Sequence, residues 1–196
     1  MEDTFATALH ETGHAIAFWL VGSIVRSVVI RTEAETADSP WIGGVNACSR
    51  LPDGWDGVDG SMDDVAHLRA FGIDCAVVCL AGAAAVAEVG LHDLDEYMEA
   101  QSGHESGDYH QMISKLGGFS RAVAQGIVTV AIERLWLLFG DPKVWTTALE
   151  LARELDRRRK MPGGEVTRFL ESKLGDPVAL AIRLGIPPQP DRLDGR

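Results

Sequence analysis

One pentapeptide near the start of the chain, His10-Glu11-Thr12-Gly13-His14, constrains its folding more than any other feature. It lies within residues 5–20, a run that is apolar on nearly every side, and a helix of this composition is buried in a protein core. Buried imidazoles need polar partners. Histidines four residues apart leave one face of a helix a turn apart, so both can reach a single metal ion. The alternative, two exposed histidines on a surface helix, fits these apolar flanks poorly.

The residue after the first histidine indicates what such a metal would do. Glu11 projects beside an ion held by His10 and His14, where its carboxylate can hold a water molecule and accept its proton. Zinc lowers the pKa of such a water to near neutrality. The motif therefore predicts two zinc ligands and a general base. Gly13 weakens the helix by about 1 kcal/mol relative to alanine, so we expect another segment to pass close to it.

A catalytic zinc ion also needs a third protein ligand. Position 20 is leucine, which excludes the pattern with a third histidine six residues after His14. Glu33 follows His14 by nineteen residues, a spacing used by another class of zinc peptidases. In that class the glutamate lies on a helix, whereas Glu33 directly follows a strand-like run. Glu33 is therefore the weaker candidate.

The hydrophobic periodicity predicts a mainly helical α+β domain over residues 1–186, with a small β element after the first helix and a loose tail over 187–196. β-branched residues predict a strand at 24–31, and 41–47 form a weaker second one. The expected helices cover residues 4–21, 62–89, 108–116, 120–139, 142–159, 165–174 and 177–184.

Charge, cysteine content and hydropathy limit which partners and which cellular location are expected for this chain. A net charge of −11 argues against binding to nucleic acid. Three cysteines give no disulfide framework, and Cys75 and Cys79 fit a helical core, so a cytoplasmic location is expected. The longest apolar run, residues 75–87, is shorter than the roughly 18 residues that a membrane span needs, and Glu2 and Asp3 replace the basic start of a signal peptide. We therefore expect no membrane association.

Residues 8–15 resemble the opening of the peptidase domain of the FtsH family of zinc metallopeptidases, in which a histidine-glutamate pair precedes a small residue, Gly, His and Ala. The resemblance continues in the family's order through residues 25–30, 80–85, 102–108 and 152–170. It implies a zincin-like helical fold in which His10, His14 and Asp108 bind zinc and Glu11 is the general base. The alternative for Asp108 is a helix N-cap. His104 and His110 are further candidates for the third ligand.

The resemblance implies a zinc-dependent endopeptidase that hydrolyses flexible or unfolded polypeptides. The chain holds no Gly-x-x-x-x-Gly-Lys-Ser/Thr loop, so we expect no ATP-driven unfolding by this chain itself, and its possible partners are a separate ATPase or further copies of the chain. The strand near Val28 is expected to be an edge to which an extended substrate adds.

Two alternatives to a peptidase are open, and the first rests on a departure from the family pattern. The family has paired glutamates where this chain has Val86 and Ala87, and such carboxylates can orient a metal ligand. One alternative is therefore a catalytically weak or inactive zinc-binding regulatory or interaction module. The other is a metal hydrolase that acts on a bond other than a peptide bond.

Overall fold

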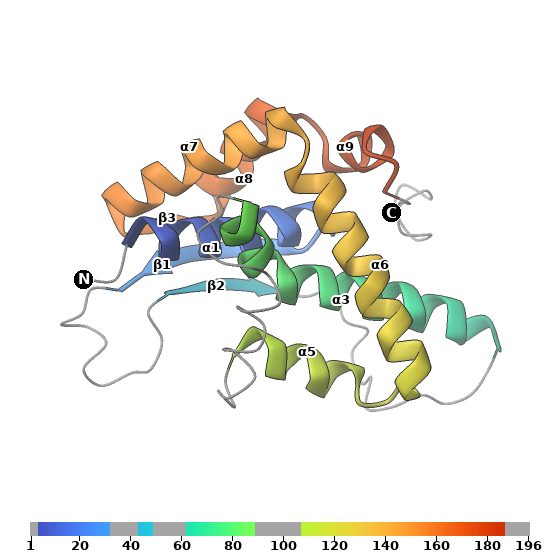
Figure 1. The fold of residues 1–196 in the computed structure, drawn as a ribbon. Coiled ribbons are helices and arrows are strands. Elements are labelled where there is room, and N and C mark those ends of the chain that lie inside the picture. The colour runs from blue at the N-terminus through green and yellow to red at the C-terminus, as the bar shows by residue number, and fades with distance from the viewer. Residues whose placement is uncertain (1–3, 32–42, 49–61, 89–106, 187–196) are drawn as a thin grey trace.

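The computed structural model describes residues 4–31, 43–48, 62–88 and 107–186. Helices dominate, and three short strands form a small sheet, so the expected mainly α (α+β) class is confirmed. The tail predicted at residues 187–196 lies outside the described residues. Figure 1 shows the elements, which in chain order are α1 (Thr4–Leu20), β1 (Ile24–Ile30), β2 (Gly43–Cys48), α3 (Met62–Glu88), α5 (Asp108–Leu116), α6 (Arg121–Phe139), α7 (Pro142–Arg158), β3 (Lys160–Pro162), α8 (Gly163–Leu174) and α9 (Pro177–Arg183).

Helix α1 is the centre of the molecule. It packs against α3, α7 and the strands β1 and β2, and Figure 1 shows it between α7 and the sheet. Leu9 and Ile16 have no exposed surface, and every residue from Glu11 to Ala17 is buried. The apolar composition of this helix is thus matched by burial on nearly every side.

Helices α1 and α3 approach unusually closely at Gly13. A Cβ atom at this position would lie 2.9 Å from the Cβ of Ala85 and closer still to the carbonyl group of Ala81. No larger residue fits without separating the helices. The expected close approach at Gly13 is confirmed, and it fixes the distance between α1 and the wall that α3 forms beside it.

The sheet has the order β2-β1-β3, and both pairings are antiparallel. Val28 lies at the centre, opposite Val45 on one side and Met161 on the other. The prediction that the strand near Val28 is an edge is therefore wrong, because β3 covers the side that was expected to be free. Among the described residues, the edge strands of this sheet are β2 and β3.

Strand β3 has only three residues, in a segment that its proline and glycines mark as a helix break. Arg159 ends α7 in the left-handed conformation, with φ of 64°, and this reverses the chain. The backbone then runs along β1, starting with the bond that the Ile30 N–H donates to the Arg159 carbonyl at 2.8 Å. A turn residue followed by three paired residues is too short a signal to be recognised in a sequence.

Two helical segments, Leu68–Glu88 and Arg121–Phe139, are long and apolar enough to cross a bilayer by length and composition. Most of the first is buried inside the protein, as in the core helix of a soluble domain. Less of the second is buried, and Trp136 and Leu137 are about half exposed. Two such helices are weak evidence for a membrane protein, so the absence of a membrane and the cytoplasmic location stay predictions.

Cys75 and Cys79 are buried on α3 and form no disulfide. Burial raises the pKa of the Cys75 thiol to about 12 and that of Cys79 to about 11, and Lys115 offsets part of each rise. Both side chains therefore stay protonated at neutral pH and pack as small apolar residues, as the sequence predicted.

A candidate metal centre on helices α1 and α5

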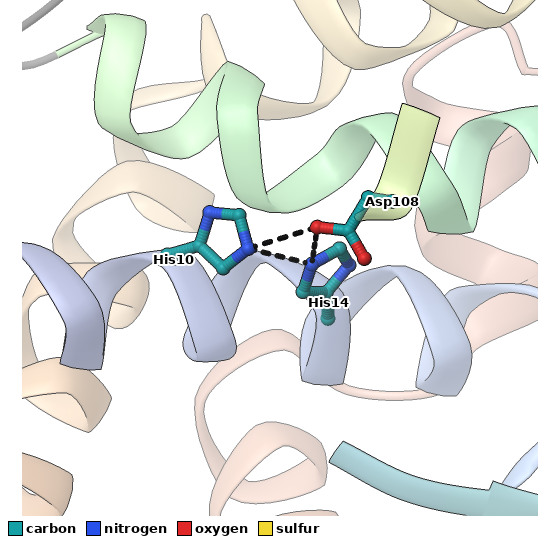
Figure 2. Close-up of side chains that lie close together, drawn as sticks. All are labelled: His10, His14 and Asp108. Atoms are coloured by element: carbon teal, nitrogen blue, oxygen red, sulfur yellow. Dashed lines mark hydrogen bonds and ion pairs between the residues drawn. The ribbon is translucent and has the colours of Figure 1, made fainter. Parts of the chain in front are cut away.

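Three side chains from two distant parts of the sequence converge on one point (Figure 2). His10 and His14 project from α1, and Asp108 is the first residue of α5. The Nε2 atoms of the two histidines lie 3.0 Å apart, and each lies 3.0 Å from Oδ2 of Asp108. In the described part of the chain, these residues form a group with the spacing of metal ligands.

The other nitrogen of His14 fixes which atom faces this point. Nδ1 of His14 lies 2.7 Å from the carbonyl oxygen of Val78 on α3. A carbonyl oxygen only accepts hydrogen bonds, so Nδ1 carries a proton. In the neutral ring, Nε2 then has a lone pair directed at Asp108 and His10. Such converging lone pairs repel one another unless a proton or a metal ion lies between them.

The donor set and its dimensions fit a zinc ion. Two imidazoles and a carboxylate are a usual ligand set for catalytic zinc. Bonds of 2.0–2.1 Å in tetrahedral geometry place neighbouring donor atoms about 3.3 Å apart, and the three donor atoms here are 3.0 Å apart. A small adjustment of the side chains brings the two values together. The same set also suits Fe(II), so the geometry alone does not choose the metal.

The start of α5 presents Asp108 to the histidines. Gly107 is the N-cap residue and makes no side-chain cap bond, so the alternative of Asp108 as the N-cap is wrong. Met112 and Leu116, four and eight residues after Asp108, are buried, and α5 packs on α3. This packing holds the first turn of α5, and with it the carboxylate of Asp108, against the imidazoles of α1.

The electrostatics of the metal-free group favour one proton on His14. Burial alone lowers the pKa of His14, but the carboxylates of Asp108 and Glu11 and the Val78 carbonyl outweigh it, and the pKa is raised to about 9. Burial alone raises the pKa of Asp108, but His14 and His10 hold it well below its usual range. A protonated His14 and an ionised Asp108 thus form an ion pair at neutral pH. A metal ion would replace the proton of this pair.

Glu11 lies beside this group and is directed toward the sheet. Only 6% of its surface is exposed, and a Cβ atom at Gly43 of β2 would lie 2.5 Å from its Oε1. Burial raises the pKa of Glu11, an effect that His10 and His14 reduce and Asp108 increases. The carboxylate predicted as general base is therefore enclosed by β2 and coupled to the charges of the three converging side chains.

Helix α3 contributes residues that the sequence analysis did not assign to the site. Val78 supplies the carbonyl group that orients His14. Gly82, one turn further along, faces both histidine rings, and a Cβ atom there would lie 2.6 Å from Nε2 of His14. The only sequence signal was the family-like run at residues 80–85, which includes Gly82 but does not reveal its contacts.

Of the remaining candidate ligands, the structure describes only His110. His110 is exposed on α5 and does not belong to the group. Glu33 and His104 lie outside the described residues. Val86 is buried and Ala87 is half-buried, so these two positions place apolar groups where the family has carboxylates.

Two comparisons of the sequence with known proteins identified no relative. A scan against protein-family models and a search of curated proteins each found no match to the chain. The resemblance to the FtsH family therefore rests on its sequence motifs alone, and the function that it implies stays a proposal.

Proposed function

We propose that this protein is a zinc-dependent peptidase that hydrolyses peptide bonds in flexible or unfolded polypeptides. The observation that carries the proposal is the convergence of His10, His14 and Asp108 at mutual distances of 3.0 Å, with the buried carboxylate of Glu11 beside them. A pure ion pair between histidine and aspartate needs only one imidazole. The second imidazole and the adjacent glutamate are what a hydrolytic metal centre requires in addition.

Each residue has a role in this proposal. His10, His14 and Asp108 hold the ion, and Val78 keeps His14 in the tautomer that binds it. Bound zinc would lower the pKa of a water molecule and polarise the scissile carbonyl group. Glu11 would accept a proton from that water and donate it to the departing amine. Burial, which raises the pKa of Glu11, suits a group that must both accept and release a proton near neutral pH.

The sheet supports a polypeptide as the substrate. β2 pairs with β1 along one edge, and its other edge has no strand partner among the described residues. An added Cβ at Gly43, the first residue of β2, would meet Glu11, so the start of this edge strand lies next to the predicted base. An extended peptide that pairs with β2 would therefore pass close to the catalytic carboxylate. Flexible segments can adopt this conformation without prior unfolding, and folded substrates would depend on a separate ATPase partner or on assembly of several copies.

The alternative is a zinc-binding regulatory module without turnover. The apolar residues at Val86 and Ala87 favour it, because a carboxylate there could have oriented a ligand. The Val78 carbonyl group already orients His14, which supports an active centre instead.

The test compares zinc-loaded wild type with Glu11→Gln on an unfolded protein substrate such as casein. The substitution keeps the size of the side chain and removes its basicity, and Glu11 is not a ligand. We expect equal zinc content and a loss of about 100-fold or more in the rate of cleavage. Equal rates, or no cleavage by the wild type, would favour the regulatory module.

A further inference from the structure

Position 82 stands out in the middle of α3. Residues 81–85 read Ala-Gly-Ala-Ala-Ala, and glycine weakens a helix interior relative to alanine. The φ angle of Gly82 is not among the positive values in the described chain, so the backbone does not require glycine here. The reason for glycine must lie in what surrounds it.

The surroundings of Gly82 are the two imidazoles of the candidate metal centre. An added Cβ atom would lie 2.5 Å from Cε1 of His10, 2.7 Å from Nδ1 of His10 and 2.6 Å from Nε2 of His14. All three distances are far below van der Waals contact. A single methyl group would thus press on both rings, including the nitrogen of His14 that faces Asp108.

Neither the helices nor His14 can easily move away. The contact of Gly13 with Ala81 and Ala85 sets the separation of α1 and α3 on either side of Gly82. His14 is buried, with 7% of its surface exposed, and Nδ1 of His14 lies 2.7 Å from the Val78 carbonyl oxygen on the same helix as Gly82. The strain of a methyl group would therefore be relieved by rotation of the rings, mainly that of the less buried His10, which would separate the donor atoms.

We propose that Gly82 is a positioning residue for the metal centre: its missing side chain leaves the space in which His10 and His14 can direct their Nε2 atoms at one ion. Gly82 would touch neither the ion nor the substrate. The inference rests on the proposed function only in so far as His10 and His14 bind a metal, and it does not require that peptides are cleaved.

The first experiment measures zinc binding to Gly82→Ala by titration calorimetry. Gly126→Ala is the matched control, because Gly126 is also within a helix and an added Cβ there meets nothing within 4 Å. We expect Gly82→Ala to bind zinc at least about 100-fold more weakly than wild type, and Gly126→Ala to match wild type. Affinity of Gly82→Ala within about threefold of wild type would overturn the proposal.

A second experiment covers the case in which Gly82→Ala folds poorly, or in which wild type binds no zinc. The melting temperature of the metal-free protein is compared for Gly82→Ala in two backgrounds, wild type and His10→Ala/His14→Ala. If the rings are what the methyl group meets, the substitution lowers the melting temperature in the first background and not in the second. An equal decrease in both would contradict the proposal. Wild type could bind no zinc while Gly82→Ala lowers the melting temperature only in the wild-type background. This result would refute the proposed function, but it would support the inference that Gly82 leaves space for the two histidine rings.

Discussion

The two nitrogens of His14 have different partners: one nitrogen orients the ring, and the other faces the candidate metal position. Nδ1 donates to the Val78 carbonyl at 2.7 Å, while Nε2 faces His10 and Asp108 at 3.0 Å. The sequence predicted His10, Glu11 and His14 because their relation is local to one helix. Asp108 came only from the family resemblance, since no local pattern links residues 94 positions apart. Val78, Gly82 and Gly43 could not be predicted, because their roles depend on how α3 and β2 pack on α1.

At the residue scale, a substitution at Gly43 tests the role of Glu11 as the base independently of the metal ligands. A methyl group at Gly43 would displace the Glu11 carboxylate, because the added Cβ would lie 2.5 Å from Oε1. We expect Gly43→Ala to lower the rate of peptide cleavage by about 10- to 100-fold, since a shift of about 1 Å can cost this much. Zinc affinity should stay within about threefold of wild type.

Gly44→Ala is the control for this substitution, because an added Cβ at Gly44 meets nothing within 4 Å. Its cleavage rate should match that of wild type. If Gly43→Ala and Gly44→Ala cleave the substrate equally well, then Gly43 does not position Glu11.

At the scale of elements, the small sheet depends on how α8 begins. Gly163, the first residue of α8, packs directly on β1: an added Cβ would overlap the Val25 carbonyl and lie 2.7 Å from the carbonyl carbon of Arg26. The helices were predictable from their apolar periodicity, with ends that differ by at most two residues. Strand β3 was not, because its existence depends on pairing with β1. Val29, which pairs with Lys160 of β3 and with Gly44 of β2, is thus central, and Val29→Pro would disrupt the sheet.

The contact at Gly163 gives a stability prediction. Gly163→Ala should lower the free energy of unfolding by roughly 2–3 kcal/mol, because the backbone of β1 cannot yield as a flexible side chain would. Gly164→Ala is the matched control, since its added Cβ meets only the Arg168 side chain at 3.7 Å. Urea denaturation should show Gly164→Ala at or slightly above wild type. Equal midpoints for the two variants would show that α8 does not need this close approach.

At the scale of the whole molecule, the centre couples metal binding, protonation and stability. In the metal-free protein, the pKa of His14 is raised from 6.5 to about 9. The ion pair therefore stabilises the fold fully below pH 6.5, and this contribution is lost as the pH rises through 9. The pKa of Asp108 is lowered from 3.8, so its contribution is present above that pH and is lost in acid. The ion pair therefore stabilises the metal-free protein most between about pH 3.8 and pH 6.5.

Zinc should abolish most of this pH dependence. Between pH 6.5 and 9 we expect the metal-free protein to lose on the order of 2–3 kcal/mol of stability. With saturating zinc the stability should stay nearly constant over the same range, because zinc binds more tightly as the His14 proton leaves and this gain offsets the loss. Denaturation curves at several pH values, with and without zinc, measure both slopes. His14→Ala should lack the loss tied to the His14 proton, and equal slopes with and without zinc in wild type would contradict a metal at this centre.

The most direct test of the central claim is a zinc titration of metal-free wild type, Asp108→Ala, His14→Ala and His110→Ala. His110 lies two residues from Asp108 but is exposed and outside the group, so it controls for a nearby histidine. The account predicts one zinc ion per chain for wild type and His110→Ala, with affinity at least about 100-fold weaker for the other two variants. Wild-type affinity in Asp108→Ala, or no binding by wild type, would contradict it.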